Sequence, residues 1–277
     1  MTEDLQEQET PDLGHKPDEE EVEISHTDKL VGIFTEPGNT FSKMSHFPPK
    51  TSDWIIPILL VIVVAALSYV VLMSNPEIKY SVIEKQMTEM QKNLDEAVKS
   101  GGMTQEQADV QIERTREFME NQQSMQLIIT VISIVVFTFI VFFIVSAVFW
   151  AVSKFGLKGD GNYSSAMVSY GLPSYISILQ IIVMVIAGML LNRYMTGTSV
   201  AAFMDMEANA SIVGLLLSKV DPFSIWFYAI VSIGFAKMFK SKDTGKYFAM
   251  VFGLWIGFSI ILYFIAQSFP FFKNFIR

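Results

Sequence analysis

The residue types that most often carry out chemistry are sparse in this chain. Its three histidines, His15, His26 and His46, are scattered through the amino-terminal segment, and none stands at the spacing of a metal-ligand set. There is no cysteine, which excludes thiolate metal sites, cysteine nucleophiles and disulfides. The sequence also lacks the motifs of zinc proteases, phosphate loops and serine hydrolases. We therefore expect a protein that is not an enzyme and that uses no metal or cofactor.

Apolar sequence dominates the chain instead. Residues 122–153 contain no charged side chain, which exceeds the ~20 apolar residues that an α-helix needs to cross a membrane. The whole chain is 51% hydrophobic and only 17% charged, whereas soluble domains are about a quarter charged. These values predict an all-α, polytopic integral membrane protein whose main solvent is lipid.

Five segments are long and apolar enough to be transmembrane helices, namely 54–73, 124–152, 172–192, 222–239 and 247–269. None has an Asp, Glu, Lys, Arg or His in its middle, which argues against a proton-coupled pump. Their few Ser, Thr and Gln side chains favour helix packing, with a translocation path as the alternative. Gly253 and Gly257 form a small-xxx-small motif, which favours packing inside the bundle or, alternatively, a dimer seam.

Residues 76–122 have a different pattern, with apolar side chains repeating at helical spacing on otherwise polar segments. Ser100, Gly101 and Gly102 interrupt this pattern, and Thr104 with Gln107 matches a capping box. The pattern predicts an extramembrane helical hairpin inserted into the membrane domain, whose second arm continues without a break into the second span. The apolar stripes either pair with each other or form a coiled coil that binds a partner or dimerises.

The amino-terminal segment is acidic. Residues 1–28 hold eleven acidic side chains and one basic one, Lys16, so this segment has a net charge of −10. The whole chain has a net charge of −8, so the rest of the chain is slightly positive. Such a composition predicts a disordered tail and offers no case for nucleic-acid binding. We therefore divide the chain into this tail, a juxtamembrane segment at 29–53, and a membrane domain at 54–277. Within the juxtamembrane segment, 37–39 are expected to form a turn and 40–44 a short interfacial helix.

The distribution of lysine predicts the orientation. Short loops at 153–165 and 240–246 concentrate basic residues, and short basic loops stay in the cytoplasm. We therefore expect the amino terminus inside and the carboxyl terminus outside. The long connection at 193–221 includes an apolar part too short to span, which is expected to be re-entrant or interfacial. Any cavity is expected between this connection and the third and fourth spans.

Three groups of residues in a fixed order resemble the Yip domain family, and its prokaryotic branch in particular: 33–41 just before 53–57, then 159–163, and then 221–226 with 233–236 further along. The residues on which the resemblance rests are Pro37, Gly38, Trp54, Pro57, Gly159, Gly161, Pro173, Asp221, Pro222, Phe223, Trp226 and Gly234. This family comprises five-span membrane proteins named for interaction with Ypt/Rab GTPases. In eukaryotic relatives it implies a cytosolic amino terminus and a role in vesicle trafficking. The similarity omits the hairpin, which looks like a lineage-specific insertion.

Together these observations predict a non-enzymatic membrane scaffold or organiser in the cytoplasmic (inner) membrane of a bacterium. Its expected partners are membrane lipid and either another protein or a second copy of this chain. The alternative function is a small permease or lipid-handling transporter whose path is lined by uncharged polar side chains.

Overall fold

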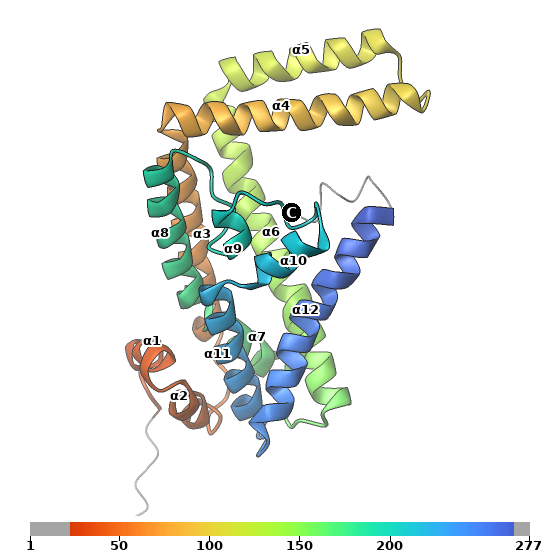
Figure 1. Ribbon diagram of the computed structural model, residues 1–277. Helices are drawn as coiled ribbons and strands as arrows, with labels where there is room; N and C mark the ends of the chain where they lie inside the picture. The colour runs from red at the N-terminus through yellow and green to blue at the C-terminus, as the bar shows by residue number, and fades with distance from the viewer. Residues whose placement is uncertain (1–22, 269–277) are drawn as a thin grey trace, which may run out of the picture.

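The computed structural model describes residues 23–268, and every regular element in that range is helical (Figure 1). In chain order the helices are α1 (His26–Thr35), α2 (Pro37–Met44), α3 (Ser52–Met73), α4 (Pro76–Lys99), α5 (Gln105–Asn121), α6 (Gln123–Ala151), α7 (Tyr163–Gly171), α8 (Ser174–Leu191), α9 (Val200–Phe203), α10 (Ile212–Lys219), α11 (Pro222–Met238) and α12 (Thr244–Ser268). A π-helical turn at Val152–Gly156 extends α6. Helices α1 and α2 lie at one end of the bundle, and α4 and α5 lie at the other.

Four helical segments are long and apolar enough to cross a membrane, and a bent pair brings the number to five. The four are Ser52–Met73, Ser124–Gly156, Tyr163–Leu191 and Thr244–Ser268, and the pair is α10 with α11, bent by 63°. Their outer faces expose large apolar side chains such as Leu67 and Phe137. Exposing such faces to water is unfavourable, whereas contact with the hydrocarbon of a membrane is not. The predicted all-α polytopic membrane protein is confirmed.

The third span begins earlier than the sequence predicted, at Tyr163 rather than at 172. Helix α7 runs into α8 through Leu172 and Pro173, both of which have helical dihedral angles. Proline is tolerated there because the first residues of a helix have no intrahelical partner for their N–H groups. The predicted end of this span holds, because Asn192 adopts the left-handed conformation and terminates α8.

The fourth span lies where the sequence predicted it, to within one residue, and a bend separates it from α10. Helix α11 has only 17 residues, and the chain reaches it from α10, which is the apolar stretch expected to be re-entrant or interfacial. Asp221 lies at the bend, where its carboxylate accepts hydrogen bonds from the N–H groups of Phe223 and Ser224. This cap replaces the backbone bonds lost at the break and lets α11 start in a new direction.

The amino-terminal segment is more helical than predicted. A turn at 37–39 is wrong, because α2 begins at Pro37, and proline is favoured in the first turn of a helix. Helix α1 begins inside the segment expected to be disordered, where Ser25 and Asp28 form a capping box. Residues 1–22 lie outside the described range, so disorder there stays a prediction.

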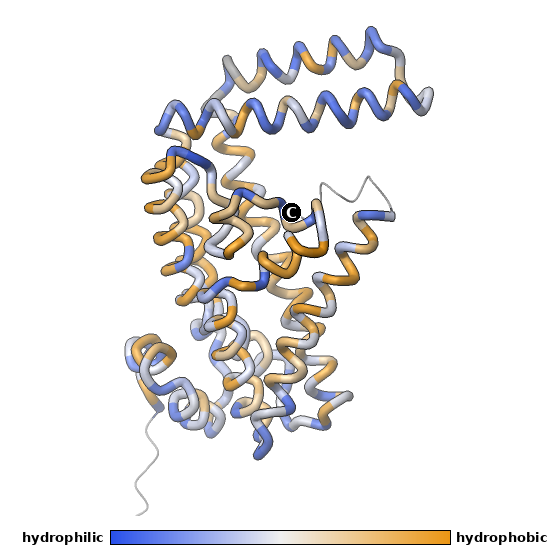
Figure 2. The backbone as a smooth tube through the Cα atoms, viewed as in Figure 1, coloured by the Kyte–Doolittle hydropathy of each residue, from blue (hydrophilic) through white to orange (hydrophobic). Residues whose placement is uncertain are grey.

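The extramembrane hairpin is present, with α4 and α5 as its arms and the predicted capping box at Thr104 and Gln107. Figure 2 shows that both arms are largely hydrophilic, in contrast to the orange bundle beneath them. The prediction that the second arm continues into the second span is wrong, because Gln122 leaves the helical conformation between α5 and α6. A continuous helix would carry the polar α5 away from α4 along the axis of α6, whereas the break lets the two arms pack together.

A close contact between two helices of the bundle lies at a glycine that the sequence analysis did not single out. A Cβ atom built on Gly171 of α7 would lie 2.6 Å from Cβ and 3.0 Å from Cα of Trp54 in α3. At Gly253 and Gly257, by contrast, a Cβ atom meets nothing within 4 Å. No described helix of this chain therefore packs on the small-xxx-small motif, and a dimer seam there stays a prediction.

This contrast provides a matched test of packing. We expect Gly171→Ala to destabilise the purified protein by about 1–3 kcal/mol, because the backbone of Trp54 cannot move aside as a flexible side chain could. Gly257→Ala is expected to be neutral or slightly stabilising, since alanine is the better helix former and the space is open. Unfolding in a titration with a denaturing detergent measures both. Equal stability of the two variants would contradict the close approach of α3 and α7.

Candidate functional site

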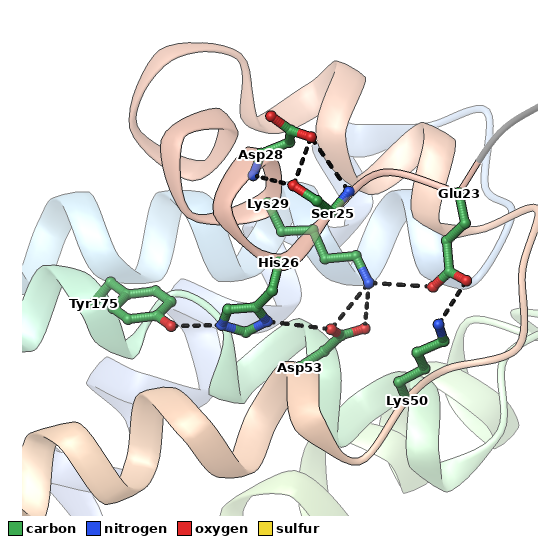
Figure 3. Close-up of polar contacts among 8 residues, drawn as sticks. All are labelled: Glu23, Ser25, His26, Asp28, Lys29, Lys50, Asp53 and Tyr175. Atoms are coloured by element: carbon green, nitrogen blue, oxygen red, sulfur yellow. Dashed lines mark hydrogen bonds and ion pairs between the residues drawn. The ribbon is translucent and has the colours of Figure 1, made fainter.

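A buried ion pair joins the amino-terminal helices to the membrane bundle (Figure 3). The Lys29 ammonium of α1 lies 3.0 and 2.9 Å from the two carboxylate oxygens of Asp53, at the start of α3. Both residues are nearly excluded from solvent, at 3% and 2% exposure. Charges this far from water are stable only when they are paired and hydrogen-bonded, so each residue requires the other.

His26, one turn earlier on α1, extends this cluster towards α8. Its Nε2 atom lies 2.7 Å from the hydroxyl of Tyr175, which is a hydrogen bond whose direction depends on the tautomer. Its Nδ1 atom lies 3.6 Å from Asp53, which is an electrostatic contact beyond hydrogen-bond distance. The cluster therefore connects three helices, α1, α3 and α8, at the end of the bundle where α1 lies.

A second ion pair lies on the outer side of the cluster. Glu23 accepts from Lys50 at 2.7 Å and lies 3.4 Å from Lys29. The hydrogen bond from Lys50 lowers the pKa of Glu23, and the same bond raises the pKa of Lys50. The stabilisation from this pair is therefore present above the ordinary Glu pKa and is lost as the pH falls through the lower folded value. Both groups reach solvent, so the pair contributes little beside the buried one.

The chemistry available to this cluster is electrostatic anchoring. The described residues contain no group of three or more His, Asp or Glu side chains that could hold a metal ion. The Asp53 carboxylate is occupied by Lys29, and it lies in the first turn of α3, where the helix dipole favours a negative charge. The cluster therefore holds α1 in place rather than presenting a free acid or base to a substrate.

Sequence reasoning missed this cluster. The sequence analysis treats His26 only as a possible metal ligand, and it includes Asp53 only in the stretch 53–57 that resembles the Yip domain family. One signal was available, because His26 and Lys29 are three residues apart and share a face of a helix that begins at a capping box. Nothing in the local pattern, however, indicates that this face meets Asp53.

Several residues singled out by the family resemblance dock the same amino-terminal helices on α11. The ring of Phe34 packs edge-on against Trp226, with centroids 5.6 Å apart. Gly234 leaves room for the ring of Phe41, whose nearest atom would be 2.9 Å from a Cβ atom at that position. Pro37 starts α2 between these two contacts, and Gly38 beside it has open space around it.

The remaining residues of this set are placed elsewhere in the bundle. Gly159 and Gly161 let their loop pack on the ring of Phe239, which a Cβ atom at either position would approach within 3 Å. Trp54 stacks on Phe142, with centroids 5.1 Å apart. The other members have local roles, with a buried Pro57 inside α3, Pro173 before α8, Asp221 capping α11, and Pro222 and Phe223 in the first turn of α11.

Asp221 is a second buried carboxylate, and it is one of the residues that line a large cleft. Beyond capping α11, it accepts hydrogen bonds from the Gln180 amide at 2.8 Å and the Thr198 hydroxyl at 2.8 Å. The cleft has a volume of about 910 Å³ and lies between the 193–221 connection, α4, α8, α11 and α12. It includes the position at which the sequence predicted a cavity.

The buried ion pair provides a direct test of anchoring. We expect Lys29→Met to destabilise the folded protein by about 3–5 kcal/mol, because it leaves Asp53 buried without a counter-charge. The double variant Lys29→Met with Asp53→Leu should recover most of this loss, since no charge is then left unpaired. Lys50→Gln is the control and should change stability little, because Lys50 is solvent-exposed. Thermal unfolding in detergent measures the stability of all three variants. A double variant that is less stable than Lys29→Met would contradict the anchoring role.

Comparison with known proteins adds the family. The model of the Yip1 domain matches residues 31–266, which includes both α2 and the inserted hairpin. No curated protein and no solved structure matches this chain. The match covers most of the chain and confirms the resemblance predicted from its sequence. The chain is an integral membrane protein that belongs to the Yip1 domain family.

Proposed function

We propose that this protein is a non-enzymatic membrane scaffold that presents its hairpin to a protein partner. The observation that carries the proposal is the placement of α4 and α5, which pack on each other beyond one end of the bundle (Figure 1). The contacts of this region with the body include a Lys85–Glu207 ion pair at 3.0 Å and a hydrogen bond between Asn75 and Asn192. Most residues of the hairpin are exposed or half-buried.

The surface of the hairpin has the chemistry of a protein-binding element. It combines many charged side chains with exposed apolar ones, of which Tyr80 is 69% and Val110 is 45% exposed. A helix pair whose only role was to connect α3 and α6 would not need arms of 24 and 17 residues. Exposed aromatic and aliphatic side chains surrounded by polar ones are typical of interfaces.

The proposed orientation follows the positive-inside rule, with the amino terminus in the cytoplasm of a bacterial cell and the hairpin outside. The loops at the amino-terminal end of the bundle carry Lys154, Lys158, Lys240, Lys242 and Lys246. The hairpin would then meet partners outside the cytoplasmic membrane.

A small permease or lipid-handling protein is the second candidate, and one observation favours it. The cleft of about 910 Å³ is lined by uncharged polar groups such as Gln180, Ser224 and Ser259, beside charged ones. Transport of a solute or lipid by the full chain in proteoliposomes would favour this candidate over the scaffold.

The scaffold is tested by photo-crosslinking in cells. We expect p-benzoylphenylalanine in place of Tyr80 or Val110 to give discrete protein adducts, because these side chains point into water on the partner-facing element. The control is the same substitution at Phe137 of α6, which is equally exposed at 68% but faces lipid. The scaffold hypothesis would be contradicted if neither hairpin position gave protein adducts. It would also be contradicted if the adducts were identical to those from Phe137.

The orientation is tested with single cysteines, which the chain allows because it has none of its own. We expect Lys92→Cys on the hairpin to react with a membrane-impermeant maleimide in intact spheroplasts. Lys242→Cys, between α11 and α12, should react only after the membrane is opened. Both residues are exposed, so the difference reports the side of the membrane. The reverse pattern would show the amino terminus outside.

A further inference from the structure

A second cleft, of about 560 Å³, lies at the amino-terminal end of the bundle. Four separate segments form it: the chain after α2, the end of α6 with its π-helical turn, the start of α7, and the end of α11. Its lining includes Trp150, Lys154, Asn162 and Lys240. The function proposed above gives this cleft no role.

The cleft has an excess of positive charge. Lys154 and Lys240 are exposed, and neither has an ion-pair partner among the described residues. Asp160 is the one carboxylate in the described lining. On the same end of the bundle Asp243 is already engaged, since it lies 3.5 Å from Lys246. Two lysines converging on one cleft without carboxylate partners indicate a site for an anion.

Trp150 lines the same cleft and carries a hydrogen-bond donor without a partner in the described part of the chain. This donor is its indole Nε1 atom, which is buried. The ring is fixed by edge contacts with Phe155 and Tyr163, at centroid distances of 5.6 and 6.0 Å. A buried N–H without an acceptor is unfavourable, so an oxygen-bearing ligand in the cleft would be stabilised by accepting from it.

The position of the cleft indicates that this anion is a lipid. The second span ends at Gly156 and the third begins at Tyr163, so the lining residues lie where the spans leave the hydrocarbon. Tryptophan and tyrosine at such span ends are typical of the headgroup region. Phe155, at 72% exposure, offers an apolar surface beside the cationic one. The acyl chains of a phospholipid would pack against this apolar surface, whereas a freely soluble anion has no apolar part that could do so.

We propose that this cleft binds the phosphate of an anionic phospholipid. Lys154 and Lys240 pair with its negative charge, and the Trp150 indole N–H donates to one of its oxygens. The Asn162 amide oxygen accepts from the Ser165 N–H and caps α7, which places the positive end of that helix dipole at the same cleft. The bound lipid would fill the space between the segment after α2 and the spans.

The charge requirement is tested by equilibrium binding of a short-chain phosphatidylglycerol to the full-length protein in nonionic detergent, against the matching phosphatidylcholine. Replacing both cleft lysines, Lys154→Gln with Lys240→Gln, should weaken phosphatidylglycerol binding about tenfold or more. The matched control, Lys158→Gln with Lys242→Gln, removes the same charge from the same end of the bundle but outside the cleft lining. It should change binding by less than about threefold. Equal losses in both double variants, or equal affinity for the two lipids, would overturn the proposal.

A second variant distinguishes a cleft from a diffuse basic surface. Trp150→Phe keeps the ring and the net charge but removes the N–H donor, and it should weaken phosphatidylglycerol binding about threefold or more. A diffuse basic surface would not respond to this change, so unaltered affinity would overturn the proposal. Glycerol phosphate distinguishes a lipid from a soluble phosphate: as a competitor at the same concentration it should displace little of the lipid, and equal potency would overturn the assignment to a lipid.

Discussion

The ion pair between Lys29 and Asp53 is the interaction on which the docking of the amino-terminal helices depends. Both groups are excluded from water, and an unpaired charge in such a place would be strongly disfavoured. The pair therefore fixes α1 against the start of α3. With α1 held there, Phe34 reaches Trp226 and Phe41 reaches Gly234, and both contacts continue the docking onto α11. Helix α11 in turn packs on α12, which connects the first and last parts of the chain.

The second constraint is that parts of the chain suited to lipid alternate with parts suited to water. The spans have apolar outer faces, and several ends of the helices coincide with a polar cap or a break. Asn75 caps α4 where the chain leaves the first span, Gln122 interrupts the helix where it re-enters, and Asp221 caps α11 at the bend. The side chains of Asn75 and Asp221 accept hydrogen bonds from backbone N–H groups that have no partner at the start of a helix. The hairpin can thus be long and polar without disturbing the bundle.

The features that could be predicted from the sequence are those that local physics determines. The apolar spans, the hairpin and the capping box at Thr104 follow from composition and spacing within a few residues. The buried cluster could not be predicted in this way, because Lys29 and Asp53 are 24 residues apart and meet only when α1 folds back. The roles of the glycines could not be predicted from the sequence for the same reason. A neighbouring helix packs closely at Gly171 and not at Gly257, and a short motif does not specify which helix lies opposite a glycine.

The charges at the amino-terminal end of the bundle fall into two groups with different consequences. Lys29 and Lys50 are engaged by Asp53 and Glu23, and Glu23 is the tenth of the eleven acids in the amino-terminal segment. Those charges hold the protein's own elements together. Lys154 and Lys240 have no such partner among the described residues, although they lie at the same end. A basic group that a fold leaves unpaired at the membrane surface remains available to an external anion, and lipid phosphate is the anion most abundant there. The same end of the bundle therefore uses paired charge for its own docking, and the proposed lipid site would use its unpaired charge.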